Sequence, residues 1–281
     1  MKIGPYDIIP IETGRFALDG GAMFGVVPKN LWNRTNPADE YNRIELALRS
    51  LLLKSSDHCI LIDAGINKNF DEKLSSIYKI DFSKYSLEKS LAKYDINPRD
   101  ITDIIITHLH FDHAGGCSFK ENNVLKLTFP NANHYIQEKQ WYWALNPSEK
   151  DRASFFEDHF KLIEKEGKLK LLKGPDQIIP AIEIFVLNGH TPAMQIVKIA
   201  DEKNILLFCS DLIPTASHIS IPWVMAYDNE PLTTIMEKKA LLPRIVEEKW
   251  ILLFEHDPFR AAGTVRLTEK GYKLEQEFLI D

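Results

Sequence analysis

The chain has 281 residues, of which 44% are hydrophobic and 26% are charged, and its net charge is −6. This composition is typical of a globular protein with a sizeable core. It offers neither the basic stripe that binds nucleic acid nor an apolar run of about 18 residues that could span a membrane. We therefore expect one domain over residues 1–281 in a cytoplasmic protein, without nucleic-acid or membrane partners.

The three cysteines favour the same compartment. Cys59, Cys117 and Cys209 are odd in number, widely spaced and outside any CxxC pair, so we expect no disulfide framework. Cys59 and Cys209 lie in apolar runs and are predicted to be buried. Cys117 either packs in the core, which we favour, or lines a site beside the histidine cluster that precedes it.

Apolar patterning predicts many strands and a few helices. Short β-rich runs predict strands at Tyr6–Ile11, Ile44–Leu53, His58–Ile62, Ile104–Thr107, His134–Ile136, Ile182–Leu187, Ile196–Ala200, Ile205–Cys209 and Trp250–Phe254. Amphipathic stretches predict helices at Leu87–Tyr94, Glu138–Ala144, Lys150–Gly167 and Thr233–Glu248. Several strands follow one another directly, which disfavours a doubly wound parallel sheet. The prediction is an α+β fold of two mixed sheets packed face to face, with helices on the outside.

Three of the nine histidines fall within six residues, in the sequence THLHFDHAGG. His108 and His110 follow a predicted strand two residues apart, so in an extended segment they project to the same side. Asp112 and His113 come next as the chain turns, and they can face a second point. Imidazole and carboxylate groups are ligands of zinc and related metals. Because packing so many ionisable groups together costs desolvation unless a cation offsets it, the segment predicts a metal site.

Three later residues repeat the design of a ligand-type side chain at a strand end. His190 ends EIFVLNGH, Asp211 ends NILLFCSD, and His256 follows WILLFE. Each of them alone is equally well a cap, a turn or a surface residue. Four strand ends that deliver histidine or aspartate predict one shared site.

The pattern H-x-H-x-D-H, followed by a distant Gly-His, a strand-end Asp and a late His, resembles the metallo-β-lactamase superfamily. The resemblance begins at LIDAG (Leu61–Gly65) and implies an αβ/βα sandwich with the site at the edge of both sheets. It implies two divalent metal ions per chain. Zinc is the expected metal, and Mn, Fe and Co are also compatible with these ligands. The implied ligands are His108, His110 and His190 for one ion, Asp112, His113 and His256 for the other, and Asp211 as a bridge. Asp63 would orient a ligand histidine.

Within that superfamily, three stretches are similar to the quorum-quenching N-acyl homoserine lactonases. They are Asp19–Lys29, Asp211–Ser217 and Pro222–Asp228. The resemblance implies a hydrolase that opens a lactone ring. One departure is GHTPAMQ where family members commonly read GHTPGH, so that Ala193 and Met194 replace the Gly-His from which a substrate-side contact is expected.

The apolar loop Gly20–Pro28 is unusual for a solvated segment. It is a buried strand or turn, or a wall or lid for an acyl chain, or part of a homodimer contact that shapes the pocket. The candidate substrate-binding residues are Met23, Phe24, Trp32, His218 and Trp223.

Two metal ions about 3.5–4 Å apart can share a water and lower its pKa, which yields a hydroxide able to attack a small-molecule ester or lactone. Asp112 is the candidate that carries the proton to the leaving alkoxide. Tyr227 either donates a hydrogen bond to the carbonyl oxygen or packs against Trp223.

Other functions stay open. A phosphotriesterase or arylesterase of the same fold would use the same hydroxide. A thioesterase that acts on glutathione conjugates carries a helical extension after its last ligand, whereas 25 residues (257–281) follow His256. A flavo-diiron oxidoreductase has Glu where His110 stands, and a non-catalytic module loses ligands. Because all seven candidate ligands are present, we favour the hydrolase.

Overall fold

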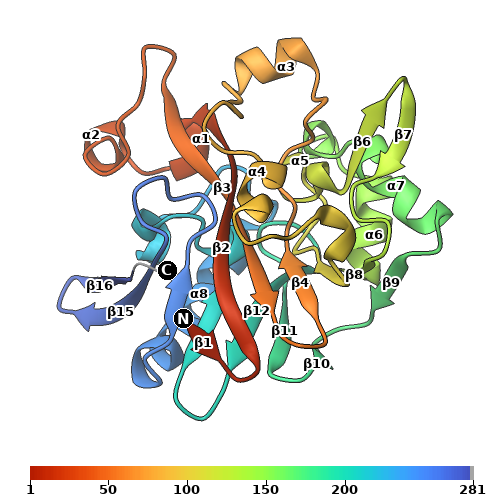
Figure 1. Ribbon diagram of the computed structural model, residues 1–281. Coiled ribbons are helices and arrows are strands. Elements are labelled where there is room, and N and C mark those ends of the chain that lie inside the picture. The colour runs from red at the N-terminus through yellow and green to blue at the C-terminus, as the bar shows by residue number, and fades with distance from the viewer. Residues whose placement is uncertain (279–281) are drawn as a thin grey trace.

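Two seven-stranded β-sheets form the centre of the computed structural model, which describes residues 1–278 (Figure 1). The first sheet has the order β1 (Lys2–Ile3), β2 (Tyr6–Asp19), β3 (Arg43–Lys54), β4 (Cys59–Ile62), β5 (Asp103–Ile105), β8 (Asn133–Gln137) and β9 (Leu169–Leu172). The second has the order β10 (Asp176–Ile179), β11 (Ile182–Leu187), β12 (Met194–Ala200), β13 (Ile205–Phe208), β14 (Ile251–Leu253), β15 (Ala262–Thr268) and β16 (Gly271–Phe278). A separate hairpin pairs β6 (Ser118–Glu121) with β7 (Val124–Leu127).

Both large sheets mix parallel and antiparallel pairs. The run from β4 to β9 is parallel, as is the pair β13–β14, and the other pairs are antiparallel. The helices are α1 (Gly20–Phe24), α2 (Lys29–Trp32), α3 (Glu72–Ile77), α4 (Leu87–Ala92), α5 (Phe111–Ala114), α6 (Glu138–Leu145), α7 (Glu157–Lys165) and α8 (Pro231–Glu247). Through residue 278, no helix combines the length and the apolar character that crossing a bilayer requires.

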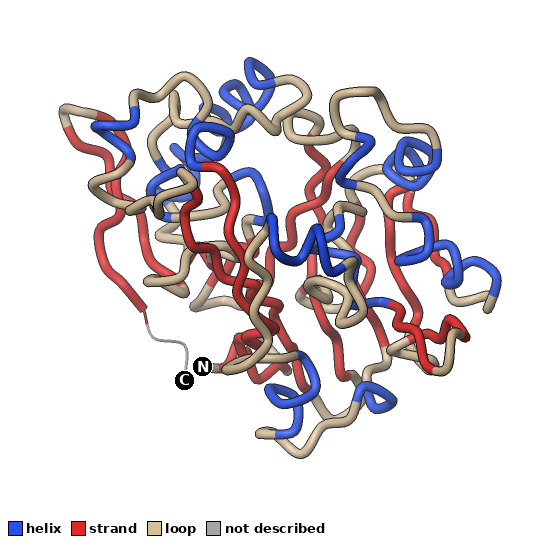
Figure 2. The backbone as a smooth tube through the Cα atoms, turned by 90° about the horizontal axis from the view of Figure 1, so that it is seen from above, coloured by secondary structure: helices blue, strands red, loops and turns tan. Residues whose placement is uncertain are grey.

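The sheets pack face to face with helices outside them, as the view from above shows (Figure 2). Apolar residues of both sheets, such as Leu51 and Val197, fill the space between them. Trp141 of α6 and Phe160 of α7 cover the outer face of the first sheet, and Leu242 of α8 covers that of the second. The central strands are therefore buried on both faces, and eight consecutive residues of β3, Leu46–Leu53, are buried. The predicted two-layer sandwich is confirmed.

Most predicted strands coincide with observed ones, and the differences have local causes. The strand predicted to end at Ile11 continues to Asp19, because β2 pairs with β3 along its whole length around a bulge between Glu12 and Gly14. Cys117 and Cys209 are buried, as predicted, but Cys59 is only partly buried at the start of β4.

The prediction of one helix over Lys150–Gly167 is wrong. The segment forms a short 3-10 turn at Arg152–Ser154 and then the helix α7, separated by extended backbone at Phe155 and Phe156. Phe155 packs in the core and Phe156 packs against Phe70. This packing outweighs the helical pattern, because burying an aromatic ring stabilises by more than the helix propensity of one residue.

Gln195 of β12 ties the two sheets together near the carboxyl end of β5. Its buried amide donates to the carbonyl oxygens of Ile106, at 2.7 Å, and Tyr135, at 3.0 Å, and accepts a hydrogen bond from Gln137 at 3.0 Å. The backbone N–H of Gln195 also donates to the carbonyl of Thr107, at 2.8 Å. Because Thr107 directly precedes His108, this contact positions the start of the histidine cluster.

We expect Gln195→Leu to lower the free energy of unfolding by about 2–3 kcal/mol, because it keeps the volume but leaves a buried carbonyl unpaired. The measurement is urea unfolding. The matched control is Gln177→Leu on the exposed part of β10, which should change stability by no more than about 0.5 kcal/mol. Equal stability of the two variants would contradict the role assigned to Gln195.

Candidate metal centre

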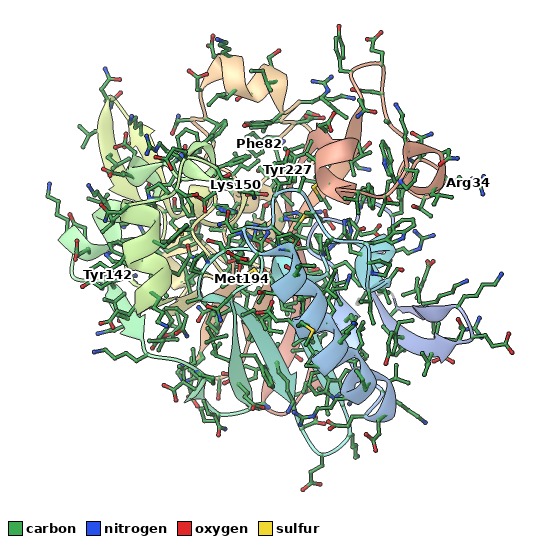
Figure 3. The ribbon with its side chains drawn as sticks, turned by 180° about the vertical axis from the view of Figure 1, so that it is seen from behind. Arg34, Phe82, Tyr142, Lys150, Met194 and Tyr227 are labelled. Carbon is green, nitrogen blue, oxygen red and sulfur yellow. The ribbon has the colours of Figure 1, made fainter. Side chains whose placement is uncertain are left out.

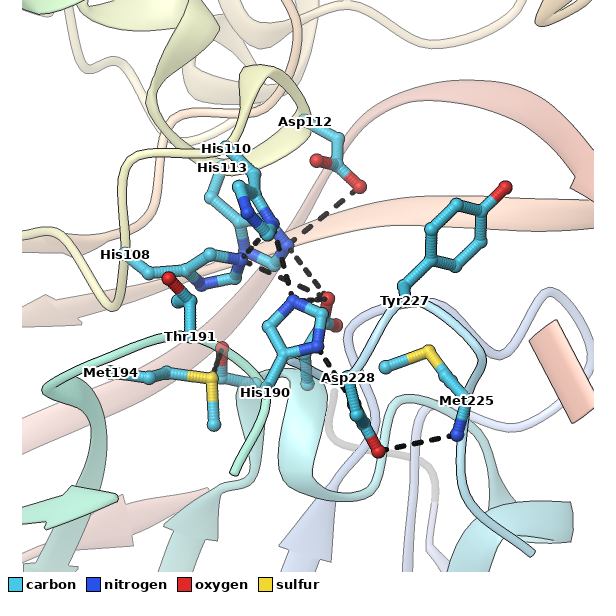
Figure 4. A network of polar contacts seen from close by, with 12 residues as sticks. His108, His110, Asp112, His113, His190, Thr191, Met194, Met225, Tyr227 and Asp228 are labelled. Carbon is cyan, nitrogen blue, oxygen red and sulfur yellow. Dashed lines mark hydrogen bonds and ion pairs between the residues drawn. The ribbon is translucent and has the colours of Figure 1, made fainter. Parts of the chain in front are cut away.

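The seven predicted ligand residues meet at one edge of the two sheets, and all are buried. Figure 4 labels five of them, His108, His110, Asp112, His113 and His190. They come from segments that directly follow strands: β5 leads to His108 and His110, β11 to His190, β13 to Asp211 and β14 to His256. The remaining two, Asp112 and His113, lie on the single turn α5, whose N-cap is His110.

The first group of ligand atoms belongs to His108, His110, His190 and Asp211. Nδ1 of His110 lies 3.0 Å from Nε2 of His108 and 3.2 Å from Nε2 of His190. Oδ2 of Asp211 lies 3.1 Å from Nε2 of His190 and 3.8 Å from Nε2 of His108. Three nitrogens and one carboxylate oxygen thus surround one point.

The second group consists of Asp112, His113 and His256. The Nε2 atoms of the two histidines are 3.2 Å apart, and Oδ2 of Asp112 lies 3.7 Å from each of them. Asp211 also reaches this group, with Oδ1 at 3.2 Å from His256 and Oδ2 at 3.6 Å from His113. Its carboxylate therefore lies between the two groups, where a bridging ligand would be.

Fixed acceptors determine which nitrogen of three histidines faces the cluster. Nδ1 of His190 donates to Asp228 at 2.9 Å, Nδ1 of His113 to Asp63 at 3.0 Å, and Nδ1 of His256 to the carbonyl of Ala47 at 2.9 Å. Carboxylate and carbonyl oxygens only accept, so each Nδ1 carries a proton, and in its neutral form each ring turns a bare Nε2 lone pair inward.

His108 is oriented through Thr107. The Thr107 hydroxyl donates to Asp63 at 2.6 Å, which leaves its oxygen free to accept from Nδ1 of His108 at 3.2 Å. Asp63 also accepts the backbone N–H of Thr107 at 2.7 Å. The structure thus places Asp63 where it orients His113 directly and His108 through one hydroxyl.

The donor set fits divalent cations. Bare nitrogen lone pairs that face one another at 3.0–3.2 Å repel unless a proton or a cation lies between them. Burial opposes charge on His190, but the carboxylates of Asp211 and Asp228 outweigh it and raise its pKa to about 9. Burial and the neighbouring imidazoles lower the pKa of His108 and His110 well below the usual value. Carboxylates that attract a proton also attract a metal cation. Both groups present ligands of the types that zinc binds.

Two buried acids beside the ligands escaped prediction. Asp228 lay in a stretch singled out only for its resemblance, and Glu255 precedes His256. Oε2 of Glu255 lies 3.2 Å from Nδ1 of His113. Burial, together with the charge of Asp63, raises the pKa of Glu255. The only feature of the sequence that could have indicated Glu255 is its position next to the ligand His256. Asp228 could not be found in this way, because its contact with His190 forms only when the chain folds.

A cavity of about 280 Å³ opens over the ligand groups. Asp112 and Tyr227 both line it, and so does Met23. Its apolar wall includes Leu18, Met23, Tyr78, Phe111 and Met225, and its polar wall includes Lys150, Asp151 and Ser154. Burial raises the pKa of Tyr227, so its hydroxyl stays protonated.

The other four candidate substrate-binding residues do not line this cavity. Phe24 stacks on Trp32 and on His218, with ring centroids 5.4 and 4.7 Å apart, and Trp223 meets Phe24 edge to face at 5.6 Å. His218 also has Nε2 2.8 Å from the carbonyl oxygen of Met23. These side chains lie behind the cavity wall because their rings bury one another, and they support Met23.

Neither Ala193 nor Met194, which replace the usual Gly-His, lines the cavity. Met194 is fully buried in the core, and the Ser210 hydroxyl contacts its sulfur at 3.7 Å. Ala193 adopts a left-handed backbone conformation with φ 57°, a region that usually costs a residue other than glycine about 1 kcal/mol. The departure from the usual pattern thus lies behind the ligands, away from the cavity.

Comparison with known proteins agrees with this geometry. The model of the metallo-beta-lactamase superfamily matches residues 48–264, and the chain belongs to that superfamily. It is a metal-binding hydrolase of this fold. The structure of a probable metal-dependent hydrolase from Staphylococcus aureus is 30% identical, with a TM-score of 0.87 over 99% of this chain and 100% of that one.

More distant relatives have named activities. An N-acyl homoserine lactonase of Bacillus cereus is 24% identical over 252 residues, which cover 85% of this chain and 89% of that protein. One from another Bacillus is 28% identical over 228 residues, 76% and 82% of the two chains. The dizinc quorum-quenching lactonase AidC shares the fold, with a TM-score of 0.82 at 22% identity over 100% of this chain and 97% of that one.

Lys238 of α8 supports the loop that carries Tyr227 and Asp228. Its fully buried Nζ donates to the carbonyls of Ser220, at 2.7 Å, and Trp223, at 3.0 Å. A neutral amine has two N–H groups for these two acceptors, whereas an ammonium has three. Burial lowers the pKa of Lys238 to about 7.

We expect Asp228→Asn to weaken zinc binding by about tenfold, because it removes the charge that orients His190. The measurement is the zinc retained after dialysis against graded concentrations of a chelator. Asp176→Asn, on the exposed start of β10, is the control. Equal retention by both variants would show that Asp228 does not support the site.

The stability difference between wild type and Lys238→Met should depend on pH. Between about pH 7 and the ordinary lysine value of 10.5, the unfolded chain binds a proton that the folded chain lacks, so the stability conferred by Lys238 rises with pH. Relative to Lys238→Met, wild type should gain about 1–3 kcal/mol from about pH 7 to pH 9. Urea unfolding at both pH values measures this, and a constant difference would contradict a neutral Lys238.

Proposed function

We propose that this hydrolase opens the ring of a lactone of the N-acyl homoserine type and that it uses two zinc ions to do so. The observation that carries the proposal is the pair of His/Asp groups that share Asp211 at the base of one cavity. His108, His110 and His190 would hold one ion, and Asp112, His113 and His256 the other. Relatives named N-acyl homoserine lactonase, which align over most of the chain, support the choice of substrate.

Two divalent ions held there would supply a water of lowered pKa and polarise the ester carbonyl. The chain's own residues have complementary roles. Asp112 lies at the cavity floor, with Oδ2 3.7 Å from both His113 and His256, where its carboxylate can take a proton and return it to the departing alkoxide. The protonated hydroxyl of Tyr227 can donate to the carbonyl oxygen of the ester.

The cavity suits a small, partly apolar substrate. Its volume of about 280 Å³ is near the lower end of the usual range for ligand pockets. Leu18, Met23 and Met225 offer a surface for hydrocarbon, while the ester lies over the ligand groups. We propose that Met23, supported by the aromatic rings behind it, contacts the acyl chain.

The test is lactone hydrolysis followed by pH-stat on zinc-loaded protein. We expect N-hexanoyl homoserine lactone to be hydrolysed faster than a paraoxon-type phosphotriester. His108→Ala should lower kcat/KM by about 100-fold or more, because loss of a ligand exceeds the usual cost of losing an outer contact.

His58→Ala is the matched control, because His58 lies away from the cluster and contacts Asp103 at 3.3 Å. It should retain wild-type activity. Full activity in His108→Ala, or fewer than about one zinc ion per chain in active protein, would overturn the proposal. A preference for the phosphotriester would replace lactonase by phosphotriesterase.

A further inference from the structure

The polar wall of the cavity is formed by the segment between α6 and α7, where the predicted helix is broken. Lys150, Asp151 and Ser154 of this segment line the cavity. Asp151 anchors the segment, because its buried carboxylate accepts from Trp143 at 2.8 Å and from Asn229 at 2.6 Å. The wall is therefore a fixed surface.

Lys150 is held at the cavity rim by the loop that carries Tyr227 (Figure 3). Its Nζ donates to the carbonyls of Tyr227 and Asp228, both at 2.9 Å. An ammonium has three N–H groups, so one remains for a further acceptor. Across the described residues, Lys150 forms no ion pair with a carboxylate. Burial lowers the pKa of Lys150, and the nearby carboxylates of Asp228 and Asp151 oppose that shift.

Much of the remaining lining is apolar or negatively charged. Leu18, Met23 and Met225 present hydrocarbon and sulfur, whereas Asp112 and Asp211 at the floor carry negative charge and only accept. The donors that line the cavity are the hydroxyls of Tyr78, Ser154 and Tyr227 and the ammonium of Lys150. Of these the ammonium is charged and already held by two carbonyls, so it forms the stronger hydrogen bond with a substrate carbonyl outside the reacting ester.

We propose that Lys150 is a specificity-determining residue that donates its third N–H to a carbonyl oxygen in the substituent of the lactone ring. It thereby distinguishes acylamino lactones from alkyl lactones. The inference rests on the proposed lactonase activity and extends it to the part of the substrate that does not react. Lys150 is tethered in place, so little side-chain freedom is lost when the bond forms.

The test compares two lactones that differ only in the amide group. N-Hexanoyl homoserine lactone carries the amide carbonyl, and in α-heptyl-γ-butyrolactone methylene groups replace the amide. Lys150→Met should lower kcat/KM for the amide substrate by about tenfold, mainly through KM, since a hydrogen bond to a charged group is lost. The alkyl lactone should change by less than about twofold, because it has no acceptor at this point.

A second readout does not require turnover. In titration calorimetry, the ring-opened acid of the amide lactone should bind the Lys150→Met variant about tenfold more weakly than wild type, and the ring-opened acid of the alkyl lactone should not. Lys150→Arg, which keeps the charge and the donors, should restore much of the preference for the amide.

Lys238→Met is the matched control for loosening of the loop. Both lysines donate to two carbonyls of the loop 220–228, but Lys238 does so from the core, and only Lys150 lines the cavity. Lys238→Met should change both lactones equally. Equal losses on both lactones in Lys150→Met would overturn the inference and leave the lactonase proposal intact. A wild type that opens neither lactone would overturn both.

Discussion

Mutually repelling nitrogen lone pairs, held a little over 3 Å apart inside the protein, are the constraint around which this structure is arranged. His113 follows a strand of the first sheet and His256 follows a strand of the second. Their Nε2 atoms face each other at 3.2 Å. Each ring is held by a hydrogen bond at its other nitrogen. Asp63, which accepts a hydrogen bond from His113, and Ser210, which directly precedes Asp211, both have left-handed backbone, with φ 56° and 46°. Strain of this kind persists only where surrounding contacts enforce it, and a bound cation would turn the repulsion into attraction.

The metal ligands could be predicted from sequence because their signal is local. Apolar strands that end in His or Asp put a rigid element next to a ligand, and His108 and His110 obey the two-residue period of an extended chain. The sandwich was predictable for a similar reason, since strands that follow one another directly favour two packed sheets. Asp228 was not predictable, because its contact with His190 spans 38 residues and no local pattern encodes it.

Side-chain packing explains where the structure departs from what the sequence pattern suggests. The break in the helix predicted over Lys150–Gly167 exists because Phe155 is buried in the core, 4.7 Å from the ring of His110. Phe24, a candidate substrate-binding residue in a loop that the sequence left open between a buried turn and a pocket wall or lid, is fully buried in an aromatic stack. A sequence shows that such rings will be covered, but the fold decides whether ligand or protein covers them.

In this structure the metal ligands and the polar wall of the cavity lie on different parts of the chain. Strand ends carry the ligand residues, whereas a connecting segment carries the polar wall of the cavity, and its anchor Asp151 contacts Trp143 and Asn229. Substitutions in that segment can therefore alter which molecules are admitted while the strand ends keep their geometry. Evolution can explore new specificities in such a scaffold one surface residue at a time, without passing through forms that have lost the ability to bind metal.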